Sequence, residues 1–137
     1  MSTGPKPGLH ADEALEARTR RRRELRRHGI EARMALPPAT HAALSTRVCE
    51  LIPQHFPELA GMHVAFCWPY RNEPDLRPLM QSWLAEGNPG YAALLPVVID
   101  ADRALAFRAC TPDCTMRTDR YGIPTPSSGE FLTPDAL

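Results

Sequence analysis

The chain has 137 residues, 16 basic and 16 acidic side chains, and four cysteines. This length fits one domain with a substantial buried core. No apolar run approaches the roughly 20 residues of a membrane-spanning helix, and the first residues lack the apolar centre of a signal peptide. The sequence therefore predicts a cytoplasmic protein, not associated with a membrane, whose thiols are reduced.

The zero net charge hides a difference between two parts of the chain. Residues 1–36 hold nine Lys or Arg against five Asp or Glu, whereas residues 37–137 hold seven against eleven. The basic part either binds an anion or forms the solvated face of a helix.

The first part of the chain is predicted to be helical after a short tail. Residues 1–10 are rich in Gly and Pro and predict a disordered tail, and we take residues 11–137 as one domain. From Asp12 to Leu36 good helix formers dominate, with a weak point near Gly29. A second helix opens at Pro38, and Pro53 and Pro57 close it. Its apolar residues share one side: Ala42, Leu44, Val48, Leu51 and Ile52.

A strand, a loop and a third helix follow. The strand runs from Val64 to Trp68, and the helix has Asp75 at its amino end and Gly87 just past its carboxyl end. The apolar run from Tyr91 to Ile99 predicts a second strand. Strand, helix and strand in this order predict a right-handed crossover and a parallel pair.

The remainder of the chain is predicted to be less regular. The turn formed by residues 100–103 leads to a short strand over residues 104–109. Beyond Cys110 only Tyr121-Gly122-Ile123-Pro124-Thr125-Pro126 has an ordered pattern. These elements indicate the α/β class.

The arginines between residues 18 and 27 are the first candidate site, and there are seven of them. Arg22 and Arg26 lie four apart, so on a helix both guanidinium groups can reach one phosphate chain. The alternatives are a solvated helix face and an arm that binds nucleic acid. No aromatic residue interleaves the arginines, which disfavours single-stranded nucleic acid.

The loop after the first strand is the second candidate. Glu73, between Asn72 and Pro74, can accept hydrogen bonds from the N–H groups of a heterocyclic ligand, or it caps the third helix. Trp68 can form a wall for a flat ring, or it is a partly buried core aromatic. Ligands of α/β proteins bind at the carboxyl ends of the strands, where this loop emerges.

Cys110 and Cys114 raise the question of a metal site. Zinc sites need four donors, and no second pair with suitable spacing follows these two cysteines. The sequence therefore predicts no metal site here. It also contains no glycine-rich phosphate loop and no hydrolase triad pattern, so catalytic residues stay unassigned.

Taken together, these segments resemble the 5-formyltetrahydrofolate cyclo-ligase family, also called methenyltetrahydrofolate synthetase. The family opens on a basic helix with a K-x-x-L-R-like pattern, matched here, with Arg in place of Lys, by Arg22-Arg23-Glu24-Leu25-Arg26. A Ser-x-x-aliphatic helix and a Glu-x-Asp loop follow, matched by Ser45-Thr46-Arg47-Val48 and Glu73-Pro74-Asp75. Gly87, residues 94–98, residues 105–108 and residues 121–124 come in the family's order, and the resemblance covers residues 20–137.

The resemblance implies a three-layer, Rossmann-like fold and an enzyme of folate one-carbon metabolism. Such an enzyme uses ATP and Mg²⁺ to convert 5-formyltetrahydrofolate to 5,10-methenyltetrahydrofolate. By position, ATP would contact Arg22, Arg23, Glu24, Leu25 and Arg26. The folate substrate would contact Trp68 and Glu73. Thr125 stands where a glutamate is frequent in the family.

One segment of the family has no counterpart. The family continues into further strands and a glycine-rich R-L-G-x-G-x-G-Y-Y-D segment, whereas this sequence ends at Leu137. The resemblance thus implies a sheet without its carboxyl-terminal strands, and self-association through an exposed sheet edge. The alternatives are a truncated remnant without catalysis and an arginine-rich nucleic-acid-binding protein.

Overall fold

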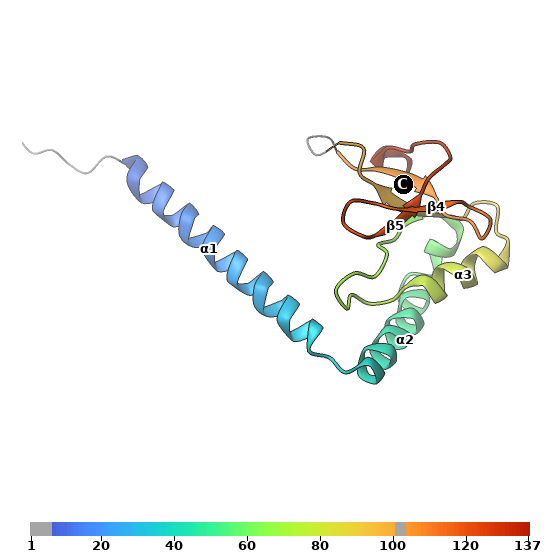
Figure 1. Ribbon diagram of the computed structural model, residues 1–137, viewed down its shortest axis with the longest axis horizontal. Helices are drawn as coiled ribbons and strands as arrows, with labels where there is room; N and C mark the ends of the chain where they lie inside the picture. The colour runs from blue at the N-terminus through green and yellow to red at the C-terminus, as the bar shows by residue number, and fades with distance from the viewer. Residues whose placement is uncertain (1–6, 101–103) are drawn as a thin grey trace, which may run out of the picture. The chain divides into compact units, whose positions relative to one another are not determined.

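The computed structural model describes residues 7–100 and 104–137 (Figure 1). The chain divides into two compact units, Met1–Leu36 and Pro37–Leu137, and each unit is described by itself. The predicted domain spanning residues 11–137 crosses this division and stays a prediction. The predicted turn over residues 100–103 lies, apart from residue 100, outside the described residues, as do residues 1–6 of the predicted tail.

The first unit is one helix, α1, which spans Pro7–Met34. It begins before the predicted start, so residues 7–10 are helical, and it runs through Gly29 without interruption. A glycine inside a helix costs about 1 kcal/mol, which the strong helix formers around it offset. Ion pairs one turn apart add support, such as Arg27 Nη1 to Glu31 Oε1 at 3.1 Å.

The second unit opens with α2, Pro38–His55, and a short 3-10 helix, η1, Pro57–Gly61. Pro38 occupies the first turn, where its missing N–H costs nothing. The helix ends between Pro53 and Pro57, as predicted, where Phe56 N–H donates to Ile52 O at 2.8 Å. The predicted apolar side is partly wrong, because Leu44 is 51% exposed while Ser45 is buried.

A three-stranded sheet follows, in the order β1 (His63–Ala65), β2 (Ala92–Val97), β3 (Ala106–Ala109). The helix α3, Arg77–Glu86, lies between β1 and β2 in the chain. β1 and β2 are parallel, as predicted, and β3 is antiparallel to β2. β1 is shorter than predicted: Phe66 N–H makes a last bond to Leu94 O at 2.8 Å beyond it.

Pro96 explains why the two parallel strands separate. Cys110 N–H bonds to Ala93 O on the β3 side, and Phe66 N–H bonds to Leu94 O on the β1 side. Because these directions alternate along a strand, Pro96 faces the β1 side, where its missing N–H offers no bond. Its carbonyl accepts instead from Thr125 Oγ1 at 3.2 Å. A crevice therefore opens where β1 would otherwise continue.

The core lies between the sheet and α3. Trp83, 3% exposed, packs edge-on against Tyr91 with 5.6 Å between ring centroids. A T-shaped pair of this kind adds about 0.5–1.5 kcal/mol beyond the buried area. α3 ends, as predicted, at Gly87, whose φ of 68° is the left-handed conformation that glycine adopts at little cost. The other buried members of the cluster are Phe66, Leu79, Met80, Ala93, Leu95 and Cys110.

The segment beyond Cys110 is more regular than the sequence indicates. β4 (Met116–Thr118) and β5 (Pro124–Pro126) form an antiparallel pair, and only β5 falls in the predicted ordered piece. A short 3-10 helix, η2, spans Pro134–Ala136. Each strand has three residues, too few for the β-branched, alternating signal by which strands are recognised.

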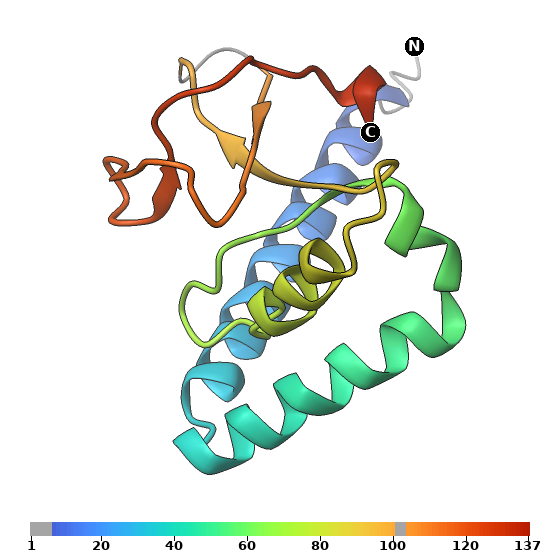
Figure 2. The same ribbon diagram turned by 90° about the vertical axis from the view of Figure 1, so that its right-hand side faces the viewer.

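The α/β fold class is confirmed. α2 and α3 lie on the same side of the sheet, and the β4–β5 hairpin lies away from α2 (Figures 1 and 2). Within the described residues, none of the helices combines the length and the apolar character needed to cross a membrane.

Candidate functional site

The loop between β1 and α3 carries Glu73 on a tight turn. Glu73 N–H donates to Tyr70 O at 3.1 Å, and the two residues between have positive φ, 49° for Arg71 and 61° for Asn72. Two positive φ values are the pattern of a type I′ turn, which favours Asn and Gly. Arginine in this conformation is uncommon, and such strain persists only where the surroundings hold the backbone in place.

A row of three side chains on α2 holds that loop. His41, Ser45 and Cys49 are spaced by four, so they line one face of the helix. His41 Nε2 lies 2.8 Å from Glu73 O, Asp75 N–H donates to Ser45 Oγ at 3.0 Å, and Cys49 Sγ donates to Asp75 O at 3.4 Å. Every contact goes to the loop backbone. The row, named here the α2 row, therefore fixes the loop without using its carboxylates.

The loop passes into α3 through a bidentate ion pair. Arg77 Nε and Nη2 donate to the two carboxylate oxygens of Asp75 at 2.8 and 2.9 Å. These hydrogen bonds hold the pKa of the Asp75 carboxyl below its usual value. The Arg77 guanidinium also lies 4.8 Å from the centroid of the Trp68 ring, a cation–π distance. Trp68 is thereby fixed against α3.

Glu73 and Trp68 line the same cavity, whose volume is about 220 Å³. The structure thus brings together the two residues that the sequence assigned to the folate substrate. The cavity lies where the parallel strands end, the usual ligand position in α/β sheets. The other lining residues are Cys67, Tyr70, Leu95, Pro96, Val98, Asp119, Tyr121, Ile123 and Pro124.

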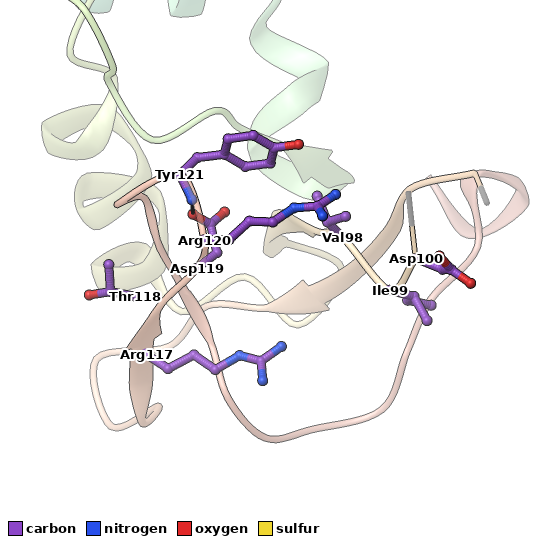
Figure 3. Close-up of a pocket in the computed structure, with 8 residues that line it drawn as sticks. All are labelled: Val98, Ile99, Asp100, Arg117, Thr118, Asp119, Arg120 and Tyr121. Carbon is purple, nitrogen blue, oxygen red and sulfur yellow. Dashed lines mark hydrogen bonds between the residues drawn. The ribbon is translucent and has the colours of Figure 1, made fainter. Parts of the chain in front are cut away.

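A second cavity, of about 390 Å³, adjoins the first, since Val98, Asp119 and Tyr121 line both. Arg117 and Arg120 line it as well, and Figure 3 shows both side chains extending in the same direction from the β4–β5 hairpin. Neither arginine was predicted from the sequence as a candidate site residue. The one feature of the sequence that could have pointed to them is the adjoining Tyr121-Gly122-Ile123-Pro124 segment, which forms a turn beside the cavity.

Asp119 in this second cavity has a structural role. Its Oδ1 accepts from Tyr121 N–H at 2.8 Å (Figure 3). It also accepts from Ile123 N–H at 3.0 Å. Gly122, with φ of 77°, forms the turn between them. The carboxylate therefore shapes the turn that presents the Tyr121 ring, which is 55% exposed.

The predicted ATP-binding residues lie in the other unit. Arg22, Arg23, Glu24, Leu25 and Arg26 are all on α1 and all exposed, Leu25 by 54%. The predicted ATP set and the predicted folate set thus belong to different compact units. Among the described residues, no three His, Cys, Asp or Glu side chains come together as a metal site.

No protein-family model matches the sequence, and no curated protein matches it. Among solved structures, the NMR structure of 5,10-methenyltetrahydrofolate synthetase from Aquifex aeolicus is similar to this chain, with a TM-score of 0.69 and 27% identity. The likeness covers 83% of this chain and 56% of the Aquifex protein, so the chain spans a little over half the length of that relative. The fold seen here is similar to that of this synthetase. The structural relative is an enzyme of folate metabolism.

Proposed function

We propose that this chain takes part in the ATP-dependent conversion of 5-formyltetrahydrofolate to 5,10-methenyltetrahydrofolate. The observation that carries the proposal is the meeting of Glu73 and Trp68 in one cavity, within a fold similar to that of a methenyltetrahydrofolate synthetase. The motif order in the sequence and the structural likeness are separate arguments for the same family. The cytoplasm is the proposed location.

In the proposed folate site, Glu73 binds the heterocyclic ring of the folate, and Trp68 forms a wall beside that heterocycle. A carboxylate at the mouth of a largely apolar cavity suits a heterocycle whose N–H groups donate hydrogen bonds. Trp68 offers a flat apolar face, and Arg77 holds the Trp68 ring in place. The α2 row fixes the backbone of Glu73 and Asp75, which supports recognition because a fixed acceptor loses little entropy on binding.

In the proposed ATP site, the arginines of α1 bind phosphate. The segment Arg22-Arg23-Glu24-Leu25-Arg26 is exposed, and its planar guanidinium groups match pairs of phosphate oxygens. Mg²⁺ enters with the nucleotide, since it is commonly held by phosphates, waters and only one or two carboxylates. The ATP would supply the phosphoryl group that activates the formyl oxygen.

The experiment is a direct assay of ring closure. The purified chain is mixed with 5-formyltetrahydrofolate, ATP and Mg²⁺, and methenyltetrahydrofolate is followed by its absorbance. Turnover that depends on ATP supports the proposal. A flat trace from a chain that melts cooperatively contradicts it and favours the alternative of a non-catalytic relative.

Two variants assign the half-sites. Glu73→Gln should raise the KM for the folate about 10-fold or more, as expected for loss of a charge-assisted hydrogen bond. Its control is Glu58→Gln in η1, an exposed carboxylate outside the cavities described above. If both variants bind folate like the parent chain, Glu73 has no role in the site.

For ATP, the double variant Arg22→Gln/Arg26→Gln should raise the KM for the nucleotide. Arg20→Gln/Arg27→Gln removes the same charge from another face of α1 and is the matched control. Equal losses in the two double variants would indicate a general effect of positive charge. Binding of RNA or DNA that weakens steeply with salt, and equally in both, would favour the nucleic-acid alternative.

We further propose self-association through β1. β1 is the outer strand of the described sheet, with β2 on one side only. An edge strand offers unpaired backbone groups to a second chain. Sedimentation analysis at increasing concentration should show dimers or larger species, and a monodisperse monomer at all concentrations would contradict this.

A further inference from the structure

The sulfur atoms beside α3 form a cluster that has no part in the proposed folate site or the proposed ATP site. Cys114 Sγ lies 3.7 Å from Cys110 Sγ and 3.5 Å from Met116 Sδ. These three side chains line a cavity of about 340 Å³, together with the sulfur-bearing Met80. Sulfur is therefore carried by four of the ten residues that line this cavity.

The backbone holds this cluster in place. Cys110 N–H donates to Ala93 O in β2 at 2.7 Å, which fixes the first thiol against the sheet. Cys114 N–H donates to Thr111 O at 3.1 Å, closing a turn that brings the second thiol back toward the first. Met116 is the first residue of β4, which pairs with β5. All three donors are thus positioned by regular hydrogen bonds.

From this geometry we infer that Cys110, Cys114 and Met116 bind a soft monovalent cation of the copper(I) class. Two thiolates and a thioether are the donors such an ion prefers. A three-coordinate ion with metal–sulfur bonds of about 2.3 Å, a length typical of thiolate ligands, sets its sulfur atoms about 4 Å apart. The two separations from Cys114 Sγ, 3.7 Å to Cys110 Sγ and 3.5 Å to Met116 Sδ, need to open by only a few tenths of an ångström.

Zinc fits this cluster poorly. Structural zinc takes four donors from thiolate, imidazole and carboxylate groups, and no such third donor joins the two cysteines among the described residues. A thioether suits copper(I) instead. Binding exchanges the two thiol protons for one M⁺, with no change of oxidation state, and leaves one unit of negative charge. Arg77, whose guanidinium is paired with Asp75, lines the same cavity.

Tyr91, in the same part of the core, gives a separate argument for a charged group near Cys110. Its hydroxyl is buried and has no hydrogen-bond partner in the described structure. A metal thiolate at Cys110 provides a negatively charged sulfur near a donor that otherwise has no acceptor.

The experiment is an anaerobic titration of the reduced full chain with copper(I) held by a colorimetric chelator. A single thiol does not compete with such a chelator, so the parent chain should remove one equivalent through the cluster. Met116→Leu should bind about 10-fold more weakly or worse, since ligand-sphere changes commonly cost 10–100-fold in affinity. Leucine and methionine have similar volumes, so this variant should still fold.

Matched variants separate the outcomes. Cys110→Ser/Cys114→Ser should lose binding, and Cys67→Ser, which changes an exposed cysteine outside the cluster, should bind like the parent. Bound copper(I) should also protect Cys110 and Cys114, but not Cys67, from alkylation as mapped by mass spectrometry. Affinity unchanged in Met116→Leu, or a Cys110–Cys114 disulfide that forms in place of metal binding, would overturn the inference.

Discussion

The Glu73 loop and the arginine segment of α1 carry comparable weight in the sequence but differ in structure. The loop is held by three contacts from the α2 row and by the Asp75–Arg77 ion pair. The side chains of Arg22 and Arg26 stand on an exposed helix. A charged motif alone therefore specifies what kind of ligand is attracted, whereas a supported loop also specifies where a ligand is held.

The largest contrast should appear in stability. Trp83→Ala removes a ring packed among Phe66 and Tyr91 and should lower the free energy of unfolding by about 3–5 kcal/mol. Leu25→Ala on α1, where the side chain is largely exposed, should change it by less than about 0.5 kcal/mol. Urea denaturation followed by tryptophan fluorescence and circular dichroism measures both. Similar costs would show that α1 contributes a buried face.

The next effect tests the α2 row. Ser45→Ala leaves Asp75 N–H without its acceptor and should cost about 1–3 kcal/mol. It should also raise the KM for the folate if the row positions Glu73. Thr46→Ala, an exposed neighbour on α2, is the control and should be nearly neutral. Loss of stability with unchanged folate binding would separate the row from the site.

A smaller effect is expected at Thr125. Thr125→Val keeps the buried shape but removes the hydroxyl that donates to Pro96 O, at a cost of about 1 kcal/mol. Because Pro96 lines the Glu73 cavity, binding of the folate should weaken along with stability. Ser127→Ala is a useful comparison, since its exposed hydroxyl bonds to Thr115 O within the hairpin region. Thermal melting distinguishes the two variants.

The smallest effect concerns pH. The pKa of Asp75 is lowered in the folded state by Arg77, so the ion pair stabilises the fold above the unfolded pKa of about 4. That stability is lost as pH falls through the lower folded pKa. Asp75→Asn should remove at most about 1 kcal/mol at neutral pH and flatten the loss below pH of about 4. An acid profile identical to the parent's, with Asp113→Asn as control, would contradict this.

The sequence was sufficient for elements with local signals and insufficient where tertiary contacts decide. The parallel pair, the third helix and its Gly87 cap follow from periodicity and chirality, and all are confirmed. The early end of β1 depends on Pro96 in a neighbouring strand, which periodicity does not reveal. The buried side of α2 was misassigned because Ser45 is buried, and His41 partly buried, by bonding to a distant loop.

The candidate site shows the same division. Glu73 and Trp68 were predicted together because they follow one strand in sequence, and the structure places them in one cavity. Arg117 and Arg120 were missed because their cavity is assembled from the end of β2 and the β4–β5 hairpin. Met116 joined the two cysteines only through folding, since spacing rules for metal sites count thiols and imidazoles.

The positive φ angles of Arg71 and Asn72 have a consequence for engineering this protein. Glycine at residue 71 would adopt the same angle without strain, so Arg71→Gly is a candidate stabilising change in the folded backbone. The same change would enlarge the range of conformations open to the loop, so the Glu73 carboxylate would be positioned less precisely. Selection for heat resistance would therefore favour glycine at residue 71, whereas selection for ligand recognition would favour arginine.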